Sequence, residues 1–303
     1  MKARRHGMGS VLAALALALL VPLGWLLAHL PARAGLWGGR RLGDLAWLAL
    51  PRRRAVTREN LARAFGTERP PAELRRLARR SFEHLGMNLV EACVLVFRPP
   101  SVLVSRVDIV GLAHLEKASA EGKGVLLLSA HLGNWELLAP ARALTAFELS
   151  VVVRPLDDPL LDRIVERFRR RSGVDLIAKR RALREIFDAL RRGRMVGVLL
   201  DQNSSRGEGV FAPFFGIPAS TSKGLAVISL RTGAPVVPVF IRRAADGRHR
   251  VECEAALPFP AEGDVVGYTA AFNRAIEAAI RRAPEQWFWM HERWRTRPRA
   301  GAS

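Results

Sequence analysis

The feature that most limits how this 303-residue chain can fold is a series of short apolar runs separated by segments of helical periodicity. The runs are nearly continuous in apolar residues, which is typical of strands covered on both faces of a sheet. We expect strands at Val125–Ser129, Leu149–Arg154, Met195–Leu200, Val236–Arg242 and Val251–Ala255, with helices between the first four. This order predicts an α/β fold whose mostly parallel sheet is flanked by helices.

The chain before these strands divides into an apolar segment and a helical segment. Residues 11–30 contain no charged residue and are long enough for a membrane helix, tilted or partly interfacial because Pro22 and Gly24 weaken it. A cleaved signal peptide is the alternative, since Ala32-Arg33-Ala34 resembles a cleavage site. More arginines follow the segment than precede it, which favours an uncleaved anchor with a cytoplasmic catalytic domain.

Two amphipathic helices are predicted after this anchor, at Arg58–Phe65 and Ala72–Phe97. We therefore expect an N-terminal membrane anchor at 1–34 and one domain at 35–303, divided into a helical lead-in at 35–100 and an α/β catalytic core at 101–303.

The charge of the chain favours anionic partners. Its 48 Lys and Arg against 28 Asp and Glu give a formal net charge of +20, which suits an anionic membrane surface or an acidic carrier protein. Nucleic acid is not expected, because the arginines are scattered and no zinc-finger or RNP-type motif is present. Cys93 and Cys253 are far apart in apolar surroundings, which indicates two reduced core thiols and no metal motif.

Polar residues at the carboxyl ends of the expected strands are the candidate site, since ligands bind at that edge of a parallel sheet. His131 follows the first strand and Glu136 lies five residues later, in a first helical turn. A carboxylate folded back onto the imidazole would make it a general base for a substrate hydroxyl. Alternatively, the histidine caps a loop and the glutamate favours a helix N-terminus. No metal is expected, because the histidines lack ligand spacing.

Other candidates follow neighbouring strands or lie in aromatic segments. Arg154 could bind a phosphate, or pair with Asp157 or Asp158, and Asp201 and Gln202 could bind an acceptor sugar or serve as turn residues. Lys223 follows Ser220-Thr221-Ser222 at an expected helix N-terminus, which is an anion site or a plain cap. The aromatic candidates for an acyl channel or membrane contact, with core packing as the alternative, are Phe211, Phe214, Phe215, Trp289 and Trp294.

The motif SAHLGNWELLAP, which includes Asn134 as a further substrate-binding candidate, resembles the H-x-x-x-x-[DE] motif of the bacterial lipid A lauroyl/myristoyl acyltransferase family. This family is a branch of the lysophospholipid acyltransferase superfamily. The resemblance covers nearly the whole chain and continues in R-x-N-L-x-x-x-F from Arg58, in Arg154-Pro155, in LLDQN, in VFAPFFGIPASTSKGLAVISLRTGAPVVPVF and in WFWMHERW.

The resemblance implies a glycerolipid-acyltransferase-like fold without a cofactor. It implies transfer of a fatty acyl group from acyl carrier protein or acyl-CoA to a membrane lipid at the cytoplasmic face of the bacterial inner membrane, with His131 as base and Glu136 as its orienter. A lipid A precursor or related glycolipid is the expected acceptor, and a lysophospholipid, an aminolipid or a mannosylated lipid are alternatives. Asn203 and Glu292 depart from the family pattern and put the acceptor in doubt. A non-catalytic lipid-binding protein is less favoured, because His131 and Glu136 are both present.

Overall fold

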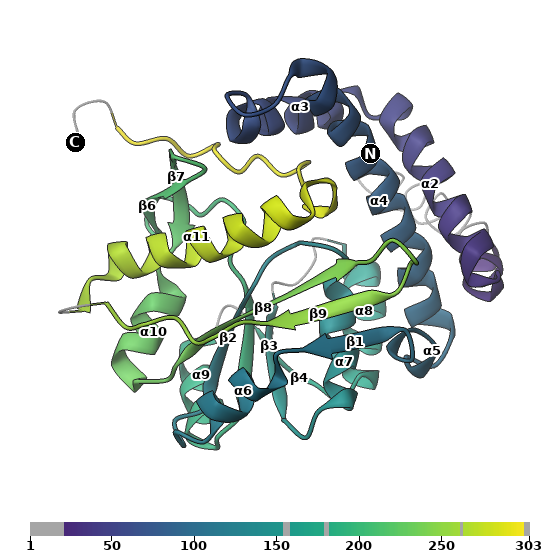
Figure 1. Ribbon diagram of the computed structural model, residues 1–303. Coiled ribbons are helices and arrows are strands. Elements are labelled where there is room, and N and C mark those ends of the chain that lie inside the picture. The colour runs from purple at the N-terminus through teal and green to yellow at the C-terminus, as the bar shows by residue number, and fades with distance from the viewer. Residues whose placement is uncertain (1–20, 154–157, 179–181, 261–262, 300–303) are drawn as a thin grey trace, which may run out of the picture.

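A seven-stranded sheet forms the centre of the molecule in the computed structural model, which describes residues 21–153, 158–178, 182–260 and 263–299 (Figure 1). The strand order is β1-β9-β8-β2-β5-β3-β4, and every neighbouring pair is parallel except β8 and β9. A separate antiparallel hairpin consists of β6 and β7. The strands are β1 Val107–Val110, β2 Val125–Ser129, β3 Leu149–Val153, β4 Asp175–Ala178, β5 Met195–Leu199, β6 Gly209–Phe214, β7 Ile217–Ser222, β8 Val236–Arg243 and β9 His249–Cys253.

The predicted α/β fold with a mostly parallel sheet is confirmed. All five expected apolar runs are strands, with ends that differ by at most two residues. Side chains of β2 alternate between two buried clusters, Leu126 and Leu128 in one and Val125 in the other, so both faces of the sheet are covered.

Helices cover the sheet and extend beyond one of its ends (Figure 1). The predicted helices at 58–65 and 72–97 correspond to α3 and α4; α3 is longer than expected because Pro51 begins it, a residue suited to the first turn. The helices are α2 Ala32–Ala49, α3 Pro51–Phe65, α4 Pro71–Phe97, α5 Ser101–Val104, α6 Leu112–Ser119, α7 Leu138–Ala141, α8 Pro159–Arg171, α9 Ala182–Arg191, α10 Gly224–Thr232 and α11 Val265–Arg282, with short 3-10 turns η1 Trp135–Leu137, η2 Arg142–Leu144 and η5 Pro284–Gln286.

Helix α2 lies against α4 through glycines, which lets the two backbones approach closely. A Cβ atom at Gly39 would lie 2.6 Å from Met87 Cα, and one at Gly43 would lie 2.3 Å from the carbonyl oxygen of Phe82. On the α4 side, a Cβ at Gly86 would lie 2.1 Å from the oxygen of Gly39. The buried face of α2 is therefore made of its smallest residues.

Most of the predicted membrane anchor lies outside the described residues, because residues 1–20 are not described. Residues 21–29 form a helix that precedes α2. Within the described part of the chain, no helix is both long enough and apolar enough to cross a membrane.

Candidate functional site

His131 and Asp201 lie side by side because they follow adjacent parallel strands. Strand β2 ends at Ser129, which pairs in register with Leu199, the last residue of β5. The Leu200 amide then donates to the Ser129 carbonyl at 3.0 Å. The two strands therefore deliver both functional side chains to the same sheet edge, as the order of the apolar runs predicts.

The Asp201 carboxylate binds the His131 imidazole on its Nδ1 side. His131 Nδ1 lies 2.8 Å from Asp201 Oδ1, and the His131 backbone amide donates to Oδ2 at 3.0 Å. The indole of Trp287 also donates to Oδ2, at 2.7 Å. A carboxylate only accepts hydrogen bonds, so Nδ1 carries the proton and Nε2 is left with a free lone pair.

The surroundings of His131 favour its protonated form. Burial lowers the pKa of the imidazole, but the charge of Asp201 and its hydrogen bond outweigh burial, and Glu136 adds to their effect, so the pKa of His131 is raised. Burial likewise opposes ionisation of Asp201, which is 2% exposed, yet His131 and Trp287 hold the pKa of this carboxyl below its usual value. The pair is thus a buried carboxylate that supports an imidazole as it takes up a proton.

The unprotonated nitrogen faces the outside of the site. The side chain of His131 is 18% exposed, and its Nε2 lies 3.3 Å from the amide nitrogen of the exposed Gln202. The half-buried rings of Trp135 and Phe288 flank the imidazole, with centroids 5.1 and 6.4 Å from it. Nε2 therefore lies next to Gln202 and beside a pair of aromatic rings that contact each other.

Glu136 does not take the place that the sequence analysis assigned to it. Its two carboxylate oxygens accept hydrogen bonds from Arg169 of α8, at 2.6 Å from NH2 and 3.1 Å from Nε. Asp201 occupies the position beside Nδ1 instead, and Glu136 makes its hydrogen bonds to Arg169. Glu136 acts on the imidazole through its charge alone.

The loop between His131 and Glu136 is fixed by backbone contacts that require glycine. Gly133 has φ +60°, and a Cβ there would lie 2.2 Å from the carbonyl oxygen of Ile241. Its carbonyl accepts from Asn88 of α4 at 2.6 Å, and its amide donates to the Gln286 carbonyl at 3.0 Å. Asn134 is buried and donates to Glu91 at 2.7 Å, so its side chain anchors the loop and does not face a substrate, contrary to expectation.

A buried ionic cluster supports this loop from α4 and β8. Glu91 accepts hydrogen bonds from both terminal nitrogens of Arg243, one of them at 2.8 Å, and lies 3.0 Å from His249 Nε2. Burial would raise the pKa of Glu91, but the hydrogen bonds from Arg243 and His249 hold it well below its usual value. Because Glu91 also binds Asn134, the ionic cluster is directly connected to the histidine loop.

The segment at 286–296 closes the other side of the site. Leu132 and Trp287 form an antiparallel bridge, and the Phe288 amide donates to the His131 carbonyl at 3.0 Å. Asn60 of α3 binds the carbonyls of Trp289 and His291, at 2.8 and 2.7 Å. The imidazole of His291 in turn accepts from the amide of Asn203 at 2.9 Å. Contacts from α3 and from the loop after β5 thus hold this segment beside His131.

Most of the chain matches a family of known enzymes. Residues 10–296 match the sequence model of the bacterial lipid A biosynthesis acyltransferases. The lipid A biosynthesis palmitoleoyltransferase of Escherichia coli K12 is 32% identical over 90% of this chain and 89% of its own length. The lauroyltransferase of the same organism is 31% identical over 90% and 89%. The phosphatidylinositol mannoside acyltransferase of Mycolicibacterium smegmatis is 27% identical over 78% of each chain.

The chain belongs to this acyltransferase family. It is therefore an enzyme that transfers an acyl group, and the family implies an acyl donor and a lipid acceptor. In this acyltransferase, the strand-end histidine of the SAHLGNWELLAP motif is His131, and the residue spaced as its acidic partner is Glu136.

Two predicted binding residues of the acyltransferase are not part of the described site. Arg154 lies outside the described residues. Lys223 is exposed just before α10, where its backbone amide donates to the Glu208 carbonyl at 3.3 Å. The helix expected after Ser220-Thr221-Ser222 is present as α10, which begins at Gly224 with Lys223 as its N-cap, whereas the three residues themselves end β7.

The aromatic candidates pack inside the protein. Phe214, Trp289 and Trp294 are 0%, 1% and 4% exposed and belong to one core cluster, which agrees with the core-packing alternative of the sequence analysis. Phe215 is buried in the same cluster, and Phe211 is half-buried on β6. The apolar segment 211–218 is a β-hairpin because Phe215 and Gly216 both adopt positive φ and form its turn.

Sequence reasoning missed three groups of the site. Arg169 was one of several arginines on α8, and only the fold distinguishes the one that faces Glu136. Trp287 was not separated from its neighbours, although a buried indole usually needs a hydrogen-bond acceptor. The available signal for Glu91 was its position in an apolar stretch of α4, since a buried carboxylate requires a partner.

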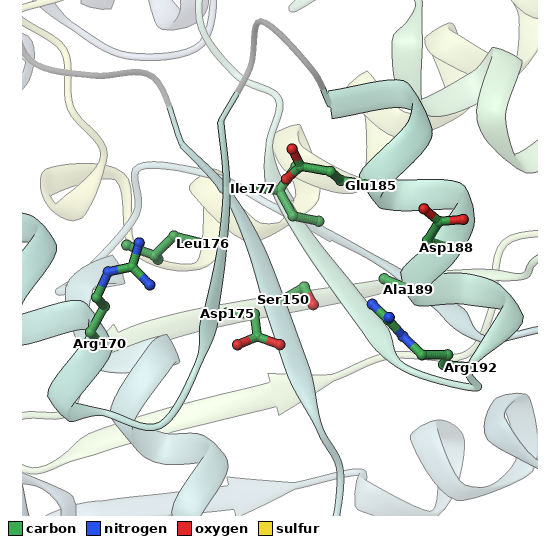
Figure 2. Close-up of a pocket in the computed structure, with 9 residues that line it drawn as sticks. All are labelled: Ser150, Arg170, Asp175, Leu176, Ile177, Glu185, Asp188, Ala189 and Arg192. Atoms are coloured by element: carbon green, nitrogen blue, oxygen red, sulfur yellow. The ribbon is translucent and has the colours of Figure 1, made fainter.

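Two cavities lie beside the sheet, and one of them borders the site. The larger, about 250 Å³, lies between β4 and α9 and is also lined by Ser150 of β3, but not by His131, Glu136 or Asp201 (Figure 2). The smaller, about 120 Å³, is lined by Val153, the residue that ends β3, and by Arg169. Among the described residues, no group of three histidine, cysteine or acidic side chains could hold a metal ion.

Proposed function

We propose that this acyltransferase moves a fatty acyl group from the thioester of an acyl carrier protein or acyl-CoA to a hydroxyl of a lipid A precursor or a related glycolipid. The observation that carries the proposal is the pairing of His131 with the buried Asp201 at the edge of the sheet. A family match over nearly the whole chain supports the lipid acceptor, because its relatives are named for lipid A biosynthesis.

The acceptor hydroxyl attacks the thioester without a covalent enzyme intermediate. It donates its hydrogen bond to His131 Nε2, which takes the proton as the hydroxyl oxygen bonds to the thioester carbonyl carbon. The resulting imidazolium is stabilised by Asp201. Collapse of the tetrahedral adduct breaks the carbon–sulfur bond, and the proton on Nε2 passes to the departing sulfur, so the imidazole is neutral again.

Glu136 and Arg169 act in this proposal as a charged pair at the mouth of the site. The Nε and NH2 groups of Arg169 bind Glu136, and its NH1 group takes no part in that pair. We propose that NH1 faces an anionic group of the donor or acceptor, for which a guanidinium is well suited. Glu136 fixes the guanidinium and adds negative charge that favours the imidazolium.

The enzyme works in this proposal at the cytoplasmic face of the bacterial inner membrane. Residues 11–30, which carry no charge, would act as an N-terminal anchor, and the arginines that follow would keep the catalytic domain on the cytoplasmic side. The net charge of +20 would strengthen contact with anionic lipids and with an acidic carrier protein.

A mannosylated lipid is the second candidate acceptor. The phosphatidylinositol mannoside acyltransferase of M. smegmatis covers 78% of this chain at 27% identity. Both classes of acceptor present sugar hydroxyls, which the His131–Asp201 pair could deprotonate in the same way.

Acyl transfer by the purified full-length protein tests the proposal. Wild type and His131→Ala are each given labelled acyl-carrier-protein thioester or labelled acyl-CoA, with a lipid A precursor, a mannosylated lipid or a lysophospholipid as acceptor. We expect transfer to the lipid A precursor by wild type, and a loss of about 10²–10⁴-fold in the variant. Transfer that is equally fast in both proteins would refute the mechanism, and transfer to another acceptor alone would refute the lipid A assignment.

A further inference from the structure

Helix α2 presents its large apolar residues to the outside of the protein. Trp37, Leu45 and Leu48 are 66%, 61% and 69% exposed, whereas the residues it buries are Gly35, Gly39 and Gly43. Gly35, Gly39 and Gly43 are spaced by four residues and therefore share one face of the helix. At 100° per residue, Trp37, Leu45 and Leu48 lie on the opposite face. A helix on the surface of a water-soluble protein normally shows the reverse arrangement.

The exposed apolar surface extends to both sides of α2. Trp25 and Leu26, in the helix before it, are 54% and 55% exposed, and Leu50, after it, is 45% exposed. Figure 1 shows α2 at the periphery of the molecule, packed on α4. A cluster of this kind marks an interaction surface, because solitary exposed apolar side chains are common but contiguous ones are not.

Arginines surround this surface. Arg33, Arg40 and Arg41 project from α2, and Arg52 and Arg53 from the start of α3, and all five are exposed. On α2 itself Asp44 is the one acidic residue, and it pairs with Arg41 and with Arg79 of α4. Large apolar side chains bordered by arginines are the pattern of a helix that lies in a bilayer interface, where the arginines meet anionic headgroups.

We propose that the outer face of α2, from Trp37 to Leu48, lies in the headgroup and upper acyl region of an anionic bilayer, with the helix parallel to the membrane plane. This inference rests on the proposed function, which places the acceptor lipid in a membrane. Helix α2 carries four charged residues among its 18, Arg33, Arg40, Arg41 and Asp44, which is why we place it along the bilayer surface and not across the bilayer. A second copy of the chain is a poorer partner, because its arginines would repel those of the first.

The position of α2 links the membrane surface to the catalytic loop. Its glycines contact Phe82, Gly86 and Met87 on α4. From the same helix, Asn88 and Glu91 bind the loop that carries His131. Helix α4 thus contacts both the helix proposed to lie on the membrane and the loop that carries His131.

Site-specific fluorescent labels on the full-length protein test this contact separately from residues 1–20. Leu48→Cys and Val266→Cys are each made with Cys93→Ala and Cys253→Ala, and labelled with an environment-sensitive fluorophore. Val266 is the matched control, because it is an apolar residue of a helix, α11, and is 48% exposed. Both labelled proteins are bound to vesicles of equimolar phosphatidylglycerol and phosphatidylethanolamine, and flotation with the vesicles verifies binding.

On these vesicles, we expect the label at position 48 to shift its emission to the blue and to lose most of its quenching by aqueous iodide. It should gain quenching by spin-labelled phospholipid, while the label at 266 stays accessible to iodide. Weaker protection is expected on neutral phosphatidylcholine vesicles, and equal protection there would refute the anionic preference. Iodide quenching at position 48 as strong as at 266, or no flotation, would overturn the proposal. Protection without vesicles that rises with protein concentration would replace the bilayer with a second copy of the chain.

Acyl transfer by the same labelled proteins separates this inference from the proposed function. A protected label at position 48 without transfer to any lipid would overturn the proposed function and leave the membrane contact standing. An accessible label with normal transfer would overturn only the membrane contact.

Discussion

Replacing Asp201 by asparagine should disable the base while keeping the shape of the site. Oδ2 of Asp201 accepts two hydrogen bonds, from the His131 amide and from Trp287, whereas Oδ1 accepts one, from His131 Nδ1. The asparagine oxygen is therefore expected at the Oδ2 position, and its amide group then faces Nδ1. The amide NH2 group donates a hydrogen bond, so the imidazole must accept it at Nδ1 and carry its own proton at Nε2. This is the wrong tautomer for a general base.

The expected loss is the full contribution of the base, about 10²–10⁴-fold in kcat/KM. The pH dependence should change in a defined direction. In wild type, Asp201 raises the pKa of His131, so the active base form is lost as pH falls through that raised value. Without the charge of Asp201, burial lowers the pKa of His131, so the residual activity should persist to lower pH than in wild type.

Initial rates of acyl transfer between about pH 5 and 9, a range that brackets the titration of histidine, measure both effects. Thermal unfolding of each variant shows that it is folded. Glu136→Gln is the comparison, because Glu136 affects His131 through its charge and has no hydrogen bond to it. If Asp201→Asn stayed within about tenfold of wild type while Glu136→Gln abolished transfer, then Glu136, as its spacing from His131 suggests, would hold the imidazole during turnover.

Three further predictions concern the charges and the loop around this pair. Glu91→Gln should leave Arg243 buried without its counter-charge and cost about 3–5 kcal/mol in chemical denaturation, whereas Glu68→Gln, at an exposed ion pair, should leave the unfolding midpoint unchanged. Gly133→Ala should lower kcat/KM by about 10²-fold, because its Cβ would push the loop from Ile241; Gly122→Ala, with a similar φ of +71° and no atom within 4 Å of its Cβ, should keep full activity. Arg169→Ala removes a charge that lowers the pKa of His131, so the acid limb of its pH–rate profile should move to higher pH, opposite to Asp201→Asn.

The sequence was sufficient to predict the edge of the sheet where the chemistry lies. Nearly continuous apolar runs identified β2 and β5, and parallel strands bring the residues that follow them to one edge. His131 and Asp201 were therefore expected there, and both are. Their direct pairing was not predicted, because Glu136 has the spacing of an acidic partner for His131. The contact of Glu136 with Arg169 of α8, 33 residues away in sequence, is indicated by no local pattern.

Elements that depend on distant contacts were the ones the sequence analysis missed. Glu91 and Arg243 are 152 residues apart, and their separate contexts, an apolar helix and the end of a strand, do not reveal that they meet. Sequence patterns do not predict the hairpin at 209–222, because proline is rare inside sheets. Pro213 and Pro218 are directly opposite each other in this two-stranded ladder, where proline is tolerated.

The bridge between Leu132 and Trp287 gives the order of synthesis a role in the activity of the enzyme. A growing chain emerges from its N-terminus, and the strands of the sheet can pair while residues 286–288 are still inside the ribosome. Until then, Asp201 lacks its indole donor and the His131 carbonyl lacks the Phe288 amide. The strands of the sheet can thus pair before the contacts that support the general base are made, so folding of the sheet alone does not complete the catalytic site.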